Sequence, residues 1–389
     1  AGLVIGALLG MFVPSEGGIA ILGDVFVGAL KAIAPLLVFF LVISSLCYAG
    51  KSHGGVIRTV IIMYMFSTFL AAIVAVTASS AFPVTLTLVD AATDMAAPQG
   101  VAEVLRTLLM NVVTNPVQSL VSANYIGILV WAVLIGIALR KASDTTKQSL
   151  NDISAALSKT VTWIIQCAPF GIMGLVYNTV SVNGLSTFTE YGKLLAVLLG
   201  SMLFIYFVTN PILVFWCIRK NPYPLIFKCL KKSAITAFFT RSSAANIPIN
   251  MEACAEMGLD KDTYSVTIPL GATINMDGAA ITITVMTLAA AHTLGIAVDI
   301  PSAIILSILA TLSACGASGV AGGSLLLIPM ACSLFGISND IAMQIVGIGF
   351  IIGVIQDSVE TALNSSSDLL LSASAEFRQW RLEGKEIKF

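Results

Sequence analysis

The sequence has 389 residues, of which 57% are hydrophobic and 11% are charged, and its formal net charge at pH 7 is −1. Soluble globular domains carry about 25% charged residues. This composition therefore excludes an ordinary soluble domain and, with a mean hydropathy of +0.94, indicates a membrane protein. A nearly neutral chain offers no electrostatic basis for binding nucleic acid. The seven cysteines are scattered, and their spacing is typical of neither a disulfide framework nor a zinc site.

Apolar stretches of membrane-spanning length follow one another along the chain. A transmembrane helix needs about 20 apolar residues, and the first half predicts six helices, near 2–13, 24–49, 56–80, 114–139, 159–182 and 194–218. The chain opens inside the first stretch, so we expect residue 1 to lie within a transmembrane helix. After residue 219 come four longer stretches interrupted by small and polar residues, near 222–257, 263–292, 301–337 and 340–375.

The distribution of basic residues predicts the orientation of these helices, because Lys and Arg collect in the cytoplasmic loops of membrane proteins. Here they follow the second, fourth and sixth predicted spans and fill the carboxyl-terminal tail, as at Arg58, Arg140, Arg219 and Arg381. The intervening loops carry only Arg106 and Lys193. We therefore expect both termini on the cytoplasmic side of the membrane.

Two of the long apolar stretches contain breaks, TRSSAANIPIN at 240–250 and SACGASGVAGGS at 313–324. Irregular backbone at membrane depth survives only where it is buried in protein or lines a watery cavity. We interpret each break as the tip of a re-entrant helical hairpin, one from each side of the membrane. Matching interruptions of this kind are typical of a transporter's midplane binding site. Ordinary packing of small residues between helices is the alternative, and neither segment alone decides between the two.

Polar residues in the last two apolar stretches favour a binding site. The motif NMDG occupies 275–278, and Asp357, Glu360, Thr361, Asn364 and Asp368 recur at offsets that line one face of a helix. Ionisable residues at membrane depth are expensive and are functional candidates by default. Carboxylates, amide oxygens and backbone carbonyls are the ligands that a hard cation prefers. A solvated loop is the alternative, and the flanking apolar run VGIGFIIGVIQ argues against it.

These motifs, in the order TRSS, NMDG, a Gly-rich hairpin tip and D-x-x-x-T-x-x-N-x-x-x-D, resemble the dicarboxylate/amino acid:cation symporters, the glutamate-transporter family. The whole chain is most similar to the family's bacterial sodium/serine-threonine symporters. The resemblance implies an all-α polytopic fold of about eight transmembrane helices and two re-entrant hairpins, working as an elevator within a homotrimer. Residues 1–218 would form six helices, comprising the scaffold and trimerisation region with part of the transport domain. Residues 219–389 would form the transport core of hairpin 1, an interrupted helix 7, hairpin 2 and helix 8.

The resemblance also implies a substrate site on the last helix. Asp357 occupies the position that binds the substrate ammonium, and Asn364 the position that holds the α-carboxylate. Backbone N–H groups at the hairpin tips, near Ser242, Ser243 and Gly319, would assist Asn364. Glu360 and Thr361 lie on the same helix and complete the predicted substrate site.

Three sodium sites are implied in the same way, and sodium is a co-transported ion here, not a prosthetic group. The first comprises Asp368, Asn364, Asn275 and the backbone around Gly271. The second comprises Asp277 and Asn275 with Tyr64, Ser67 and Thr68. The third comprises carbonyls near Thr273 and in the 314–317 stretch.

Several positions depart from the family pattern. Ala279 follows the NMDG motif where Thr is usual, and Ala317 stands where the second hairpin often carries a hydroxyl. Acidic-substrate members place an Arg where this chain has Glu360, so glutamate and aspartate are not expected as substrates. Arg241 at the first hairpin tip could pair with Glu360 or with Asp357. The resemblance thus implies sodium symport of serine or threonine across the bacterial cytoplasmic membrane, with another small carboxylate or amino acid as the alternative.

Two rival functions are also considered. The motif GASG at 316–319 fits an intramembrane serine protease with Ser318 as nucleophile, but a base must then lie within hydrogen-bond reach. The only histidines are His53, in a predicted loop, and His292, near the end of a span. A channel would suit re-entrant loops, but mixed Asp, Asn and Thr clusters favour binding over a ring of charge. We therefore expect a carrier, not an enzyme.

Overall fold

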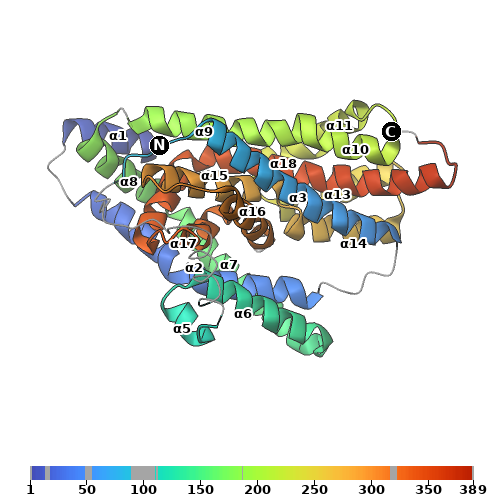
Figure 1. Ribbon diagram of the computed structural model, residues 1–389, viewed down its shortest axis with the longest axis horizontal. Coiled ribbons are helices and arrows are strands. Elements are labelled where there is room, and N and C mark those ends of the chain that lie inside the picture. The colour runs from blue at the N-terminus through green and yellow to red at the C-terminus, as the bar shows by residue number, and fades with distance from the viewer. Residues whose placement is uncertain are drawn as a thin grey trace.

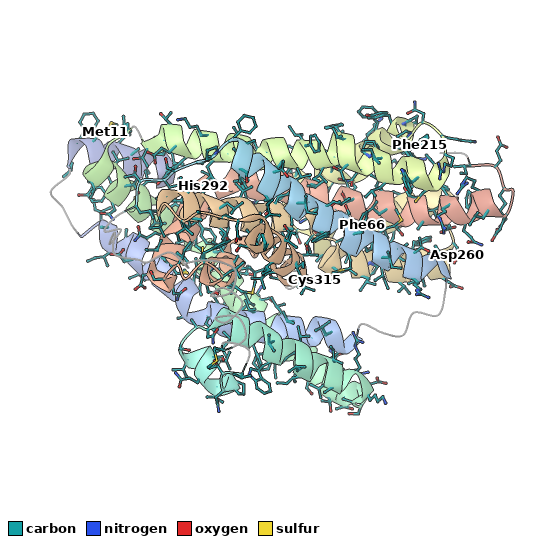
Figure 2. All side chains as sticks on the ribbon, in the orientation of Figure 1. Met11, Phe66, Phe215, Asp260, His292 and Cys315 are labelled. Atoms are coloured by element: carbon teal, nitrogen blue, oxygen red, sulfur yellow. The ribbon has the colours of Figure 1, made fainter. Side chains whose placement is uncertain are left out.

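The computed structural model describes residues 2–13, 18–48, 55–88, 110, 113–185, 187–315 and 322–387. All regular secondary structure within these ranges is helical. Five of the described helices are long and apolar enough to cross a membrane, or six if one bent pair counts as a single span. Exposed side chains such as Phe66 and Phe215 point outward from the bundle (Figure 2). The expectation of a helical multi-pass membrane protein is confirmed, whereas the number of about eight spans stays a prediction.

The first half of the chain forms helices that only partly match the predicted spans. They are α1 (Gly2–Phe12), α2 (Ala20–Tyr48), α3 (Gly55–Ala81), α5 (Pro116–Val121), α6 (Tyr125–Ala138), the short η1 (Leu139–Lys141), α7 (Asp144–Gln166), α8 (Ala168–Asn183), α9 (Thr187–Phe204), the π turn η2 (Ile205–Thr209) and α10 (Asn210–Ile218).

Two spans that were predicted to be continuous helices are each broken in the structure. The span at 114–139 breaks before α6, where the Asn124 side chain caps the new helix by accepting a hydrogen bond from Gly127 N. The span at 159–182 breaks at Cys167, with a bend of 55° between its two parts. Pro169, which lies in the first turn of α8, has no N–H to continue the hydrogen bonding of α7.

The second half contains the interruptions that the sequence predicted. Its elements are α11 (Tyr223–Cys229), the π turn η3 (Leu230–Ala234), α12 (Ile235–Thr240), α13 (Ser243–Glu256), α14 (Lys261–Ile274), α15 (Asp277–Thr293), α16 (Ile300–Ala314), η4 (Ser324–Leu327), α17 (Ile328–Ser333) and α18 (Asn339–Leu382). Asp299 caps α16, and its hydrogen bonds with Ser302 hold the pKa of this carboxyl below its ordinary value.

Helical hairpin 1, residues 223–256, turns between α12 and α13. Arg241 adopts the left-handed conformation (φ 49°) at the turn, and the Ser242 hydroxyl caps α13 by accepting a hydrogen bond from Ala245 N. The NMDG motif interrupts the chain between α14 and α15, as predicted. Hairpin 2, residues 300–333, has two helical arms that contact each other. Its tip at 316–321 lies outside the described residues.

The helices form two groups that pack against each other (Figure 1). In the first group α2 contacts α6, α7 and α8, and α8 also contacts α1. In the second group α3, α9 and α10 pack on the carboxyl-terminal elements, chiefly α15 and α18. Elements from both halves of the sequence therefore build the second group.

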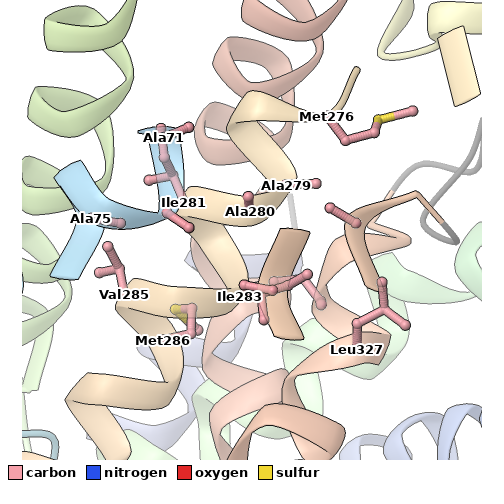
Figure 3. Packing of buried hydrophobic residues seen from close by; sticks show 14 of the residues in the cluster. Ala71, Ala75, Met276, Ala279, Ala280, Ile281, Ile283, Val285, Met286 and Leu327 are labelled. Carbon is pink, nitrogen blue, oxygen red and sulfur yellow. The ribbon is translucent and has the colours of Figure 1, made fainter. Parts of the chain in front are cut away.

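Helix α15 is the centre of the core, because every residue from Asp277 to Ala291 is buried. Small residues let α3 approach it closely: Ala71 and Ala75 lie beside Ile281 and Val285 (Figure 3). The polar residues at the start of α15 are therefore held in a rigid and fully enclosed setting.

Glycines on one face of α1 allow close contact with α8. A Cβ atom at Gly6 would lie 2.5 Å from the carbonyl oxygen of Met173, and one at Gly10 would lie 2.9 Å from that of Tyr177. Gly2 meets the Pro169 carbonyl in the same way. This four-residue repeat of glycine is the small-residue packing that membrane helices use.

We predict that Gly6→Ala lowers the stability of the purified protein by about 1–3 kcal/mol, the usual effect of overpacking. Gly28→Ala is the matched control, because a Cβ atom there would meet nothing within 4 Å. The measurement is the apparent Tm of both variants in detergent. Equal Tm values for Gly6→Ala and the wild type would show that α1 and α8 are not packed this closely.

Candidate functional site

Four buried acidic side chains lie inside the second group of helices, three of them along α18 and one at the start of α15, where the break between α14 and α15 faces α18. Asp277 and Asp368 are 0% and 1% exposed, and Asp357 and Glu360 are each 6% exposed. Helix α18 is continuous over these positions, which confirms the single helical face that the residue spacing predicted.

Asp368 lies beside the NMDG motif. Asn275 Nδ2 donates to Asp368 Oδ1 (2.9 Å), and the Tyr64 hydroxyl donates to the Asp368 carbonyl oxygen (2.9 Å). A Cβ atom at Gly271 would lie 2.8 Å from Asp368 Oδ1, so only glycine admits the carboxylate here. Among the described residues, Asp368 Oδ2 and Asn275 Oδ1 are buried and accept no hydrogen bond. Two buried oxygens with unused lone pairs therefore lie in adjacent side chains.

Asp277 is satisfied by hydroxyl groups from α3. Ser67 Oγ donates to Asp277 Oδ2 (2.9 Å), and Thr68 Oγ1 lies 3.3 Å from Asp277 Oδ1. Ser67 also lies 3.4 Å from Asn210 Oδ1. The structure thus places Ser67 and Thr68 at Asp277 and the Asn275 amide group at Asp368, as expected. It places the Tyr64 hydroxyl at Asp368 and not at Asp277, where it was expected.

The expected third ion position is only partly described. Thr273 Oγ1 donates to the Leu270 carbonyl (2.7 Å), and Cys315 Sγ lies 3.7 Å from the Ile274 carbonyl oxygen. The start of the 314–317 stretch therefore lies beside the carboxyl end of α14. Residues 316 and 317 lie outside the described residues.

Both hairpins reach Asp357. Arg241 Nη1 lies 3.9 Å from Asp357 Oδ2, and Gly322 N, at the start of the second arm of hairpin 2, donates to Asp357 Oδ1 (3.3 Å). Ser243 is buried in the first turn of α13, where helix N–H groups lack helical partners. Gly319 lies outside the described residues. The left-handed turn at Arg241 thus places its guanidinium group, the one cation within 4 Å of these acids among the described residues, beside this carboxylate.

Glu360 is bound by neutral donors instead of a cation. Its Oε2 accepts hydrogen bonds from Thr282 Oγ1 (2.7 Å), Ser324 Oγ (2.9 Å) and Gln356 Nε2 (2.5 Å). These donors come from α15, from the second arm of hairpin 2 and from the preceding turn of α18. Of the two partners considered for Arg241, the structure selects Asp357.

Asn364 joins α18 to the start of α15. Its Oδ1 accepts a hydrogen bond from Gly278 N (2.7 Å), and its Nδ2 lies 3.5 Å from the sulfur of Met276. A thioether sulfur is only a weak acceptor, so this N–H group keeps most of its capacity to donate. Thr361, one residue after Glu360, is buried on the same helix.

Sequence reasoning missed the residues that support the acids. Thr282, Ser324 and Gln356 bind Glu360, and Asn210 donates to Ser367 Oγ (3.1 Å) while it faces Ser67. Asn210 was detectable as a lone amide before a proline inside an apolar run. The residues around Glu360 gave no such signal, because isolated Thr and Ser residues are common in membrane helices.

Among the described residues, the four acids and their partners include no histidine that could act as the base of a catalytic triad. His292 lies at the far end of α15 from Asp277, while Ser318 and His53 lie outside the described residues. Among the described residues, no three His, Cys, Asp or Glu side chains are grouped to hold a metal ion. The chemistry of the site therefore rests on single carboxylates, amides, hydroxyls and backbone carbonyls.

Comparison with known proteins agrees with this chemistry. The sequence model of the sodium:dicarboxylate symporter family matches residues 1–376. The Serine/threonine transporter SstT of Bifidobacterium adolescentis is 56% identical over 387 residues, which cover 99% of this chain and 90% of the relative. Proteins of the same name from Streptococcus thermophilus and Streptococcus agalactiae are 57% and 58% identical, covering 98% and 96% of this chain and 95% and 94% of the relatives. The chain therefore belongs to the sodium:dicarboxylate symporter family.

Proposed function

We propose that this protein is a secondary active transporter that imports serine or threonine by symport with sodium. The observation that carries the proposal is the pair of buried oxygens, Asp368 Oδ2 and Asn275 Oδ1, that accept no hydrogen bond among the described residues. Family membership and the names of the relatives support the choice of ion and substrate.

Sodium ions would bind where carboxylates lie beside interrupted backbone. A buried carboxylate without a cation is unfavourable, and Arg241 is the only ion-pair partner of the four acids among the described residues. Oxygen ligands from Asp368, Asn275 and the carbonyls around Gly271 suit a hard cation, and broken helices supply them in other transporters. Asp277, with Ser67 and Thr68, would form the second site. Carbonyls near Thr273 would contribute to the third.

The substrate would bind between the two hairpin tips. Asp357 would hold the ammonium group, and in doing so it would replace or share its contact with Arg241. Asn364 Nδ2, which faces only a sulfur atom, would donate to the α-carboxylate together with N–H groups near Ser243. Thr361 lies within this part of α18 and would contact the substrate as well. Gly319 would contribute a further hairpin N–H group.

Glu360 would determine which side chains are accepted. A carboxylate held by Thr282, Ser324 and Gln356 is fixed in place, and it could accept a hydrogen bond from the hydroxyl of serine or threonine. A substrate with a side-chain carboxylate would meet a like charge instead. Two like charges about 4 Å apart cost roughly 4 kcal/mol at an effective dielectric of 20, which disfavours aspartate strongly.

The wider architecture is part of the proposal. The protein would be a homotrimer in the bacterial cytoplasmic membrane, with both termini in the cytoplasm. The group built from α3, α9, α10 and the carboxyl-terminal elements would move across the membrane as the elevator. The group built from α1, α2, α6, α7 and α8 would stay fixed and would form the trimer contacts. The separate packing of these two groups supports this division.

Uptake of radiolabelled serine into proteoliposomes tests the transport function directly. We expect saturable uptake that requires an inward sodium gradient and that neither a potassium nor a proton gradient replaces. A flux that does not saturate would indicate a channel instead. Uptake driven equally well by a proton gradient alone would exclude sodium symport.

Neutralising an ion ligand should raise the sodium requirement. We predict that Asp368→Asn and Asp277→Asn each raise the half-saturating sodium concentration for uptake on the order of tenfold, the loss of about 1.4 kcal/mol. The exposed Asp262→Asn on α14 is the matched control and should behave as the wild type. If the two buried variants keep the wild-type sodium dependence, neither acid is an ion ligand.

Removing the ammonium partner should separate ion binding from substrate binding. We predict that Asp357→Asn abolishes serine uptake, because an amide cannot offset the substrate's positive charge in a buried site. Sodium binding to the purified variant, measured by calorimetry, should persist. The exposed Asp340→Asn at the start of the same helix should transport normally. Serine uptake by Asp357→Asn at the wild-type rate would refute the assignment.

Selectivity should follow the charge at residue 360. We predict that Glu360→Gln reduces the preference for serine over alanine, and that Glu360→Arg weakens serine uptake while admitting some aspartate. Competition of unlabelled serine, alanine and aspartate against labelled serine measures both effects. Glu252→Gln, at an exposed position, is the control. An unchanged serine-to-alanine ratio in Glu360→Gln, with aspartate still rejected by Glu360→Arg, would leave Glu360 a structural role only.

A further inference from the structure

A long groove runs along the outer surface of the second group of helices, between α3 and α9. The two helices pack side by side (Figure 1), and the groove between them has a volume of about 910 Å³. Its lining includes neither the four acids nor their direct partners. The groove is therefore separate from the proposed transport site.

Small residues, whose surface is called the floor here, line the groove together with two large aromatic rings. Ala78 and Ala196 line it together with Gly200, where a Cβ atom would meet nothing within 4 Å. The exposed rings of Phe82 and Phe204 stand at the same groove, 68% and 48% exposed. A flexible hydrocarbon chain fits such a surface, because it can lie on the floor and contact the rings along its length.

Among the described residues that line the groove, which are mostly apolar but include Thr77 and Ser201, one is charged, Lys193 near the start of α9. Glu190, one turn earlier on the same helix, is bound by the backbone N–H and the hydroxyl of Thr87 (2.7 and 3.0 Å). Within the part of the chain that the structure describes, Lys193 forms no ion pair. Its ammonium group is thus available to an anion at one end of the groove.

The spacing of these features matches one leaflet of a bilayer. Lys193 and Phe204 both line the groove. Phe204 lies eleven positions after Lys193, which corresponds to roughly 16 Å at 1.5 Å per helical residue. Half of the hydrocarbon core of a bilayer is about 15 Å thick. The cation therefore stands at the depth of the lipid headgroups when the apolar part of the groove spans the leaflet.

We propose that this groove is a binding site for a single acidic phospholipid. Its phosphate would contact the Lys193 ammonium group, and one acyl chain would lie on Gly200 and the neighbouring alanines between the two phenylalanine rings. The leaflet is the outer one if the termini are cytoplasmic. Because α3 carries Ser67 and Thr68, whose hydroxyls contact Asp277, a bound lipid would also brace the helix that supports this acid.

Lipid retention by the purified protein, measured by native mass spectrometry, tests the site. Phosphatidylglycerol and phosphatidylcholine with identical acyl chains are offered at equal concentrations. We expect phosphatidylglycerol to be retained about fivefold better, since one lysine near an anionic lipid contributes about 1 kcal/mol. Lys193→Gln should remove this preference, and Lys193→Arg should keep it. Gly200→Leu should reduce retention of both lipids by filling the floor.

Two further variants serve as a replacement for Gly200→Leu and as a control for Lys193→Gln. Ala196→Leu obstructs the same floor and replaces Gly200→Leu if that variant does not fold. Lys220→Gln, at the other end of the bundle, is the matched control and should retain lipid as the wild type does. Equal retention of the two lipids by the wild type would overturn the proposal. So would a preference that survives Lys193→Gln, or one that Lys220→Gln removes.

Discussion

The structure depends on enclosing four carboxyl groups in the protein interior with a single ion pair among the described residues, between Arg241 and Asp357. Burying a charge without an oppositely charged partner has a high free-energy cost. The fold limits this cost with short-range donors: α3 hydroxyls at Asp277, the Asn275 amide at Asp368, and three neutral donors at Glu360. Asp368 Oδ2 and Asn275 Oδ1 accept no hydrogen bond among the described residues. In the proposed function, their free lone pairs would bind the transported cation.

The backbone is shaped to bring these groups together. The break at Asn275 and Met276 frees carbonyls and N–H groups at membrane depth, and it is tolerated because both residues are fully enclosed. Glycine is required where α18 approaches this break. A Cβ atom at Gly278 would lie 2.9 Å from Glu360 Cα, and one at Gly271 would meet the Asp368 carboxylate. The two glycines thus set how closely the acids of α18 can approach the interrupted helix.

Asp357 and Glu360 have different surroundings. Asp357 is linked to Arg241 and to Gly322, one from each hairpin, so this carboxylate joins hairpin 1 to the second arm of hairpin 2. Glu360 lies one turn further along α18 and is held on one oxygen by three donors. Three hydrogen bonds therefore fix the Glu360 carboxylate in place, whereas the contact between Arg241 and Asp357 is long, at 3.9 Å.

Four features could be predicted from the amino-acid sequence: the helical membrane class, the break at NMDG, the turn of hairpin 1 and the acidic face of α18. These are properties of local composition and of the 3.6-residue helical period, which short segments carry on their own. The partner of Arg241, the three donors to Glu360 and the placement of Tyr64 at Asp368 in place of Asp277 could not be predicted and were found in the folded structure. Those contacts join residues that are far apart in the chain, and their distances depend on how α3, α15, α18 and the two hairpins pack. The kink at Cys167 was also not predicted from the sequence, because the apolar run continues through it. The change in helix direction comes from Pro169 and from the packing of α8.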